Sequence, residues 1–308
     1  MNTFVIALLS VAIVVFVGWL AGKLNIIPAH VDNAFSIFIL KFSLPLLLFY
    51  SSVTTPVTQM LDPKINGAFA VSLIGMFILM FVTHKLIYKR SLQASAESAF
   101  VCAYPNSAFL GIPLMLSIVG NSAMVPIVIS NIIVGVFIIP ATLIMIEIGV
   151  MGNDKQVNIR HILLRVLKTP LIILPLCGIV LAALGVKLPE VIAHPCQMLG
   201  STTPGISLFT LGLIMSRFKI RFSKLATMNI FSKNLLHPFL MVGIVQLFGL
   251  TGIVAKELIV LCALPTAITA TIFSVTFEVE PEINVSSTIL GTILSMVTVF
   301  GFLWWLKL

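Results

Sequence analysis

The sequence predicts an all-α membrane protein, and three observations support this prediction. The 308 residues are 59% hydrophobic and only 9% charged, and the mean hydropathy is +1.16. Soluble domains carry about 25% charged residues, so a chain of this composition cannot cover itself with hydrated groups. The apolar residues also fall into runs of roughly 20, the length of a helix that spans a bilayer. Ten such runs use almost the whole chain, which excludes an additional soluble domain.

The ten predicted helices are separated by short charged or turn-forming stretches. The first run has no basic region before it, so we interpret it as a retained helix rather than a signal peptide. The long polar stretch at 151–160 divides the chain into two sets of five. The predicted helices lie near 3–22, 33–52, 65–88, 94–118, 122–149, 161–184, 190–215, 225–250, 255–277 and 283–306.

The basic residues predict the orientation in the membrane. Twelve Lys and Arg residues lie in the loops that follow the first, third, fifth and seventh helices, against four on the opposite side. Positive loops stay in the cytoplasm, so both termini are expected outside. The net charge of +8 is then a consequence of membrane orientation, and no nucleic-acid partner is predicted. The four cysteines form no CxxC pair, and neither a metal nor a cofactor is expected.

An internal repeat is visible when the chain is shifted by 160 residues. Glu97, Cys102, Ala103 and Pro105 then align with the same residue types at 257, 262, 263 and 265. Because each half has an odd number of helices, the second half must be inserted upside down relative to the first. We therefore predict two inverted five-helix repeats, 1–150 and 161–308, joined by a cytoplasmic linker at 151–160.

The fourth and ninth helices are predicted to break at Pro105 and Pro265, because proline lacks an N–H and clashes with the preceding turn. Asn106 and Thr266, which follow these prolines, are good N-cap residues. Two half-helices starting there would aim their positive ends at a bound anion. Matched broken helices are the best sequence indication of a transport site near the middle of the membrane. The alternative is that both prolines only kink their helices.

These residues resemble a known family. Asn106 to Pro113 reads Asn-Ser-Ala-Phe-Leu-Gly-Ile-Pro, which is similar to a signature of the auxin efflux carriers. Further similar motifs follow one another along nearly the whole chain, at 42–49, 168–171, 203–213 and 263–267.

The resemblance implies a fold like that of sodium/proton antiporters and bile acid symporters. In this fold helices 1, 2, 6 and 7 form a scaffold that dimerises, and helices 3–5 and 8–10 form a transport unit that moves like an elevator. The absence of the long cytoplasmic loop of plant members implies a bacterial-type carrier in the inner (plasma) membrane. Relatives of this type carry malonate or malate, and the plant members carry auxin.

Several polar residues complete the predicted substrate site. Ser107 follows Asn106, and Asn131 in the fifth helix either lines the pocket or bridges helices through hydrogen bonds. The side chains expected to face the site from the scaffold are Ser43, Pro45 and Pro204. Lys41, one turn before Pro45, either attracts the anion or extends its stem to the membrane surface.

Three ionisable residues have competing interpretations. His237 could couple proton movement or serve as a hydrogen-bonded packing residue. Glu97 and Glu257 are expected to favour the N-termini of their helices. No acidic residue lies beside Pro105 or Pro265, which argues against sodium coupling and more strongly against a cation antiporter.

The predicted function is secondary active or facilitative transport of small organic anions, such as malonate, malate or auxin-like acids, by alternating access. A sodium-coupled symporter of the bile acid type and a sensor built on a transporter fold are the alternatives. The helices show no catalytic constellation such as His-Glu-x-x-His, so no enzyme activity is predicted.

Overall fold

The computed structural model describes residues 2–28, 31–55, 58, 61–151, 164, 168–217 and 220–308, all of them helical or in short connections. The predicted linker at 151–160 therefore lies almost wholly outside the described residues. Three helices begin with the side-chain caps expected from their sequences. Asp62 accepts from the backbone N–H groups of Lys64 and Ile65, while Ser91 and Ser223 cap the helices that follow them.

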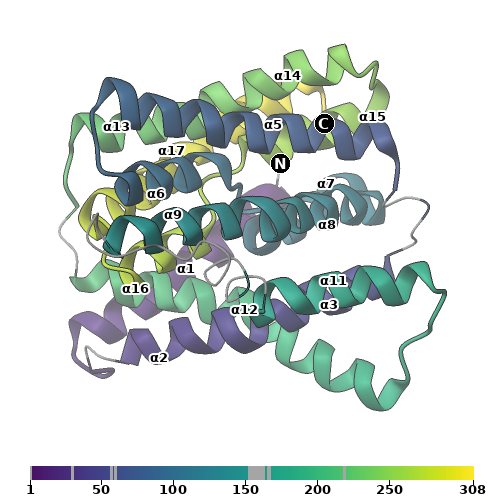
Figure 1. Cartoon of the computed structure of the whole chain (residues 1–308), viewed down its shortest axis with the longest axis horizontal. Helices are drawn as coiled ribbons and strands as arrows, with labels where there is room; N and C mark the ends of the chain where they lie inside the picture. The colour runs from purple at the N-terminus through teal and green to yellow at the C-terminus, as the bar shows by residue number, and fades with distance from the viewer. Residues whose placement is uncertain are drawn as a thin grey trace.

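The helices fall into two groups (Figure 1). In the smaller group α1 packs along α12, α12 along α3, and α3 along α11. Its members are α1 (Asn2–Lys23), α2 (Val31–Phe38), the π-helical turn η1 (Ile39–Ser43), α3 (Leu44–Thr54), α11 (Pro170–Ala183) and α12 (Glu190–Arg217).

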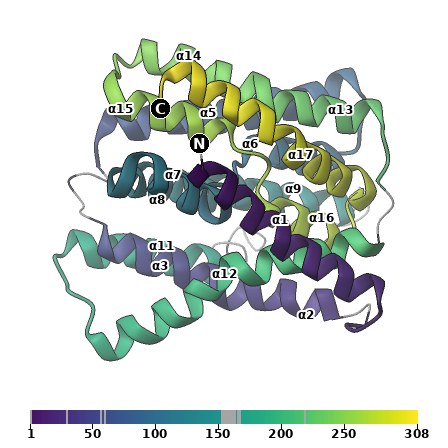
Figure 2. The same cartoon turned by 180° about the vertical axis from the view of Figure 1, so that it is seen from behind.

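The larger group has two sets of helices that pack on one another. The first set is α5 (Pro63–Val82), η2 (Thr83–Ile87), α6 (Leu92–Ala103), η3 (Ser107–Gly111), α7 (Ile112–Val119), η4 (Gly120–Ala123), α8 (Met124–Ile133), η5 (Val134–Ile138) and α9 (Ile139–Met151). The second set is α13 (Lys224–Phe231), η6 (Ser232–Leu236), α14 (His237–Leu247), α15 (Gly252–Ala263), α16 (Ile268–Thr276) and α17 (Pro281–Leu306). Seen from behind, α1 and α17 lie toward the viewer (Figure 2).

Six described helices are long and apolar enough to cross a membrane. They are Val31–Thr54, Pro63–Ile87, Val125–Val150, Glu190–Arg217, Lys224–Leu247 and Pro281–Leu306. Two of the other predicted helices, near 94–118 and 255–277, are divided into halves that are too short to span alone. Many large apolar side chains point outward, among them Trp304 and Ile6, exposed by 78% and 61%. An integral membrane protein presents such a surface to lipid.

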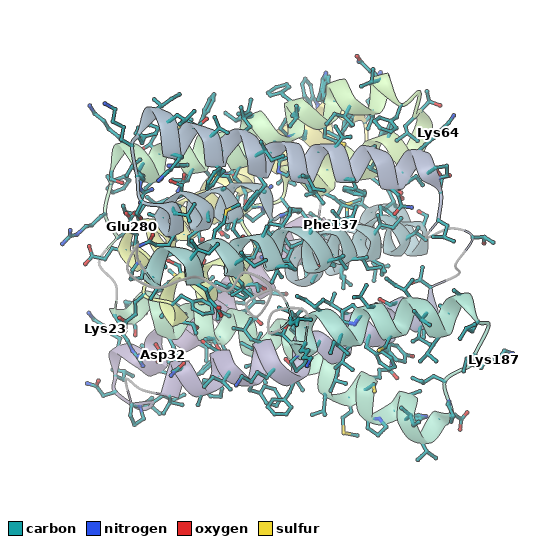
Figure 3. All side chains as sticks on the ribbon, viewed as in Figure 1. Lys23, Asp32, Lys64, Phe137, Lys187 and Glu280 are labelled. Atoms are coloured by element: carbon teal, nitrogen blue, oxygen red, sulfur yellow. The ribbon has the colours of Figure 1, made fainter. Side chains whose placement is uncertain are left out.

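Charged residues gather at the two ends of the helices. Lys64 and Lys187 lie at one end, and Lys23, Asp32 and Glu280 lie at the other (Figure 3). At the second end Arg217 of α12 forms an ion pair with Asp32 of α2 at 2.6 Å. The apolar helices between these ends match the layer that a bilayer would occupy.

Candidate site at the crossing of two broken helices

The chain leaves the helical conformation at both prolines singled out in the sequence. α6 ends at Ala103 and helical structure resumes at Ser107, while α15 ends at Ala263 and α16 begins at Ile268. The two extended segments meet in an antiparallel bridge between Pro105 and Thr266. Segments that are 160 residues apart in the sequence therefore cross inside the larger group.

Backbone hydrogen bonds hold the crossing together. The N–H of Asn106 donates to the carbonyl oxygen of Pro265 at 2.8 Å, and the N–H of Ala267 donates to that of Tyr104 at 2.9 Å. A proline cannot donate, but its carbonyl can still accept, so each break supplies an acceptor to the other segment. Exposed backbone groups would be costly at membrane depth, and this pairing satisfies them.

Asn106 occupies the N-cap position of η3, with φ −75° and ψ 53°. The N–H of Ser107 donates to the carbonyl oxygen of Pro105 at 2.7 Å, which makes this an inverse γ-turn. The side chain of Asn106 makes no capping bond. It is 4% exposed, and its Oδ1 has no hydrogen-bond partner among the described residues. Asn106 therefore has a side-chain amide available for a ligand.

Thr266 does not cap the second half-helix, contrary to the expectation from the sequence. The N-cap residue of α16 is Ala267. The Thr266 hydroxyl instead donates to the carbonyl oxygen of Val101, in the last turn of α6, at 2.9 Å. The last carbonyls of a helix lack intrahelical partners, so this buried threonine stabilises the end of the other broken helix.

Asn131 bridges helices. From α8 its Nδ2 donates to the Ser107 hydroxyl at 3.0 Å and to the carbonyl oxygen of Ile127 at 2.8 Å. Its Oδ1 accepts from the Tyr104 hydroxyl at 3.0 Å. Because Tyr104 and Ser107 flank the break, Asn131 fixes the first crossing segment from the side.

A cavity of 410 Å³ opens beside the crossing, between α1, α12 and α17. Among the described residues that line it, Asn106, Thr292 and Trp19 carry polar side-chain atoms and the others are apolar, and they come from both helix groups. They are Ala12, Val15, Phe16, Trp19, Asn106, Leu110, Leu208, Leu211, Met215, Ile268, Ile289, Thr292, Ile293 and Met296. A small organic molecule fits a cavity of this volume.

The candidate residues of the smaller group differ in their exposure. Ser43 and Pro45 are buried, Pro204 is half-buried within the continuous helix α12, and Lys41 is exposed. The hydroxyl oxygens of Ser43, Thr203 and Ser207 are buried with no hydrogen-bond partner in the described part of the chain. They come from η1 and α12, which pack on each other.

The two repeated glutamates are not in the first turns of their helices, so the expectation of a helix-end role is wrong. Glu97 lies within α6 and Glu257 within α15. Glu257 accepts from the Ser122 hydroxyl at 2.7 Å. Glu97 is fully buried, and neither of its oxygens has a partner among the described residues. Tertiary packing covers these positions, although each follows a polar connection in the sequence.

Sequence reasoning assigned no role to Lys233, which lies within the π-helical turn η6. Its side chain is fully buried, and its Nζ donates to the carbonyl oxygen of Cys262 at 2.7 Å. The Nδ1 atom of His237 lies 3.3 Å from this Nζ. The available signal was the i, i+4 spacing of Lys233 and His237, which places both on one helix face.

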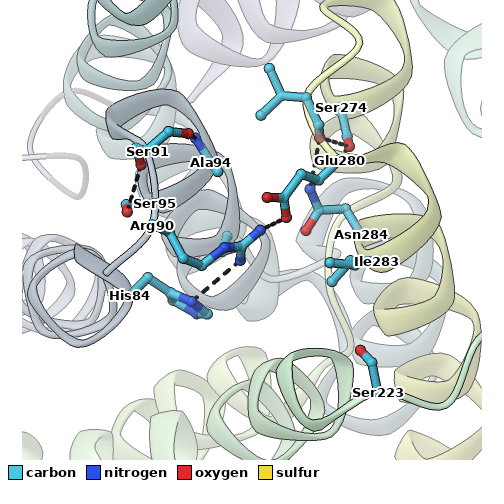
Figure 4. A network of polar contacts seen from close by, with 12 residues as sticks. His84, Arg90, Ser91, Ala94, Ser95, Ser223, Ser274, Glu280, Ile283 and Asn284 are labelled. Carbon is cyan, nitrogen blue, oxygen red and sulfur yellow. Dashed lines mark hydrogen bonds and ion pairs between the residues drawn. The ribbon is translucent and has the colours of Figure 1, made fainter. Parts of the chain in front are cut away.

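A polar network closes one end of the larger group (Figure 4). Arg90 pairs with Glu280, and it also donates to the Ser98 hydroxyl at 2.9 Å. Its guanidinium lies 3.5 Å from Nδ1 of His84, whose Nε2 is 2.9 Å from Oδ1 of Asn229. Burial lowers the pKa of Arg90 from its usual value, because removing water disfavours the charged form. The network joins the connection before α6 to the one before α17.

Replacing Arg90 with methionine is expected to lower the free energy of unfolding by about 2 kcal/mol, since the hydrogen bonds of a buried charged group are lost. Arg221→Met is the matched control. Its pair with Glu282 at 3.0 Å is exposed, with side chains 65% and 48% accessible, so the loss should stay below about 1 kcal/mol. Thermal unfolding in detergent measures both variants. Equal losses would show that the buried Arg90 network adds no more to stability than the exposed pair of Arg221 with Glu282.

Apolar spans, two broken helices that cross, and a cavity beside them together define a membrane protein of the transporter class. The chain belongs to the membrane transport protein family, whose model matches residues 3–303. This match confirms the resemblance to the auxin efflux carriers that the sequence motifs indicated. Within the described residues, no group of three His, Cys, Asp or Glu side chains is placed to hold a metal ion.

Three relatives illustrate the range of the family. The uncharacterized transporter YfdV of Escherichia coli (strain K12) is 25% identical over 292 residues, 93% of each chain. A putative malonate transporter of Rhizobium meliloti (strain 1021) is 24% identical over 304 residues, 95% of this chain and 92% of the relative. Auxin efflux carrier component 8 of Arabidopsis thaliana is 29% identical over 140 residues, 43% of this chain and 38% of the relative.

Proposed function

We propose that this protein is a secondary active or facilitative carrier of small organic anions with a carboxylate group. The observation that carries the proposal is Asn106, which lines the cavity at the N-terminus of a half-helix with a side-chain amide that makes no capping bond. The N–H groups of such an amide can donate to a carboxylate. The N–H groups of Asn106 and Ser107 donate at the break, and those of Leu110 and Gly111 donate to the Asn106 carbonyl oxygen. The N–H groups of the residues between them, 108 and 109, are then the ones that face the carboxylate in this proposal. The partial positive charge of a helix N-terminus favours such a group.

The two helix groups suggest how the anion moves. The cavity has α1 and α12 of the smaller group on one side, and α17 with the crossing segments on the other. We take the smaller group as a fixed scaffold and the larger group as the unit that carries the bound anion across the membrane. In this scheme Thr266, Pro105, Pro265 and Asn131 shape the site, and Ser43, Pro45 and Pro204 face it from the scaffold.

The remaining parts of the proposal concern the membrane setting. We place the protein in a bacterial inner membrane with both termini outside, because the basic loops then face the cytoplasm. The scaffold is the part expected to form a homodimer. The exposed position of Lys41 favours a lysine that extends to the membrane surface over one that binds substrate.

Purified protein should be stabilised against heat by the carboxylate that it carries, because a ligand that binds only the folded state raises stability by mass action. At a concentration 100 times the Kd the gain is about 2.7 kcal/mol. The probes are malonate, malate and indole-3-acetate, each with and without sodium and at two pH values, with the uncharged amide malonamide as the matched control. Stabilisation by a carboxylate but not by malonamide is the expected result. If no carboxylate shifts the unfolding temperature, the proposed anion site is wrong, and a strict sodium requirement would favour a sodium symporter.

A further inference from the structure

The ionisable amine of Lys233 lies at the end of a broken helix, where its Nζ donates to the carbonyl oxygen of Cys262. It lies in η6, which packs against α6, α13, α14, α15 and α17 in the middle of the larger group. Among the described residues, no Asp or Glu carboxylate lies within ion-pair distance of its Nζ atom. A buried ammonium without a counter-charge is costly inside a membrane, so its presence calls for an explanation.

Structural support of the helix end does not require a cation. Lys233 donates to Cys262 in the last turn of α15. The related end of α6 is satisfied by the neutral hydroxyl of Thr266, which donates to Val101. At the 160-residue shift that aligns Pro105 with Pro265, the residue matching Lys233 is Leu73, which is also fully buried. One half of the molecule therefore achieves the same packing without charge.

Lys233 is connected to the proposed anion site by a short path. Its acceptor Cys262 lies three residues before Pro265, whose carbonyl oxygen accepts from the N–H of Asn106. Two charges interact more strongly where water is excluded than they do in water. An anion at the crossing and the ammonium of Lys233 would thus attract each other electrostatically.

We propose that Lys233 is a proton-carrying counter-charge for the transported anion. This inference rests on the proposed function. When the crossing is empty, the Lys233 ammonium releases one proton to water and becomes a neutral amine. When a carboxylate binds, the amine takes one proton from water, so that the loaded unit carries one positive and one negative charge close together. Each anion that crosses on the moving unit then brings one proton with it.

The other titratable groups near Lys233 do not supply this counter-charge. His237 on α14 is its neighbour at 3.3 Å, and it adds positive charge if it binds a proton. Cys262 on α15 and Cys102 on α6 are buried thiols. The carboxylates of the same two helices, Glu257 and Glu97, form no ion pair with Lys233, and Glu257 accepts from the Ser122 hydroxyl instead. On α17, the carbonyl oxygen of Gly291 accepts from Nδ2 of Asn234 in η6. Glu282 pairs with Arg221 at the start of that helix. On α13, Lys224 is exposed.

The test counts the protons that are taken up when an anion binds. Calorimetric titration of the purified protein with malonate and with indole-3-acetate, in two buffers of different ionisation enthalpy at pH 8, gives this number directly. The unmodified protein should take up protons when the anion binds, up to a limit of about one proton per anion, because a single lysine binds at most one proton. Lys233→Arg should bind the anion with no proton uptake, since an arginine is always charged.

Two further variants complete the test. Lys233→Met, which imitates the apolar residue in the other half, should bind at least about tenfold more weakly and take up no proton. Lys64→Met removes an exposed lysine at one end of α5 and should behave like the unmodified protein. Proton uptake by Lys233→Arg, or none by the unmodified protein, would overturn this inference while leaving the carrier proposal intact. If neither carboxylate binds the unmodified protein, the proposed function fails, and this inference fails with it.

Discussion

Replacing Asn106 with alanine is expected to lower carboxylate transport at least about tenfold while leaving the protein folded. Among the described residues that line the cavity, Asn106 has the only side-chain amide, and it makes no capping bond. The crossing itself depends on the backbone N–H of Asn106, which alanine retains. Removing a buried group that bonds a charged ligand costs about 1.5–3 kcal/mol, roughly a tenfold to hundredfold loss of affinity.

Uptake of radiolabelled malonate and indole-3-acetate into liposomes measures this loss. Asn106→Asp keeps the size of the side chain and adds a negative charge, so it should exclude an anion at least as strongly as alanine does. Asn33→Ala, at an exposed position of α2, is the control and should transport normally. Normal transport by the alanine variant, or improved transport by the aspartate variant, would show that Asn106 does not bind a transported anion.

Replacing Gly212 with alanine is expected to give the largest loss of stability. A Cβ atom at Gly212 of α12 would collide with the carbonyl oxygen of Val15 in α1 and lie 2.6 Å from the backbone nitrogen of Trp19. At Gly18 of α1, a Cβ would collide with the backbone of Phe209. Small residues allow two helices to approach this closely in a membrane. Because backbone cannot move aside as a side chain does, we expect a loss of about 3 kcal/mol or more.

The unfolding temperature in detergent and the yield of monodisperse protein measure this effect. Gly205→Ala is the matched control on the same helix, since a Cβ there has no neighbour within 4 Å. It should leave the unfolding temperature unchanged or raise it slightly, because alanine favours a helix by roughly 0.5–1 kcal/mol over glycine. Equal stability of the two variants would contradict the close packing of α1 on α12.

Part of the site follows from local chemistry that the sequence displays. Pro105 and Pro265 mark candidate breaks because each lacks a backbone N–H, although Pro204 lies within the continuous helix α12. Asp62-Pro63 starts α5 because the carboxylate caps the helix and proline suits its first turn. Composition alone excludes a soluble protein, since apolar area must be covered by lipid or by other helices. These features depend on residues that are neighbours in the chain, so the sequence by itself determines them.

Other features depend on which segments meet, and only the tertiary structure decided those. Thr266 was expected to cap α16, but the crossing brings Val101 of α6 within reach of its hydroxyl. Glu97 and Lys233 could have faced water or lipid by local criteria, and packing from distant helices buries both. A helix period places residues on a face, but what covers that face is set by contacts between segments remote in the chain. The proposed anion site and its proposed counter-charge arise from such contacts, because the crossing joins segments about 160 residues apart in the chain.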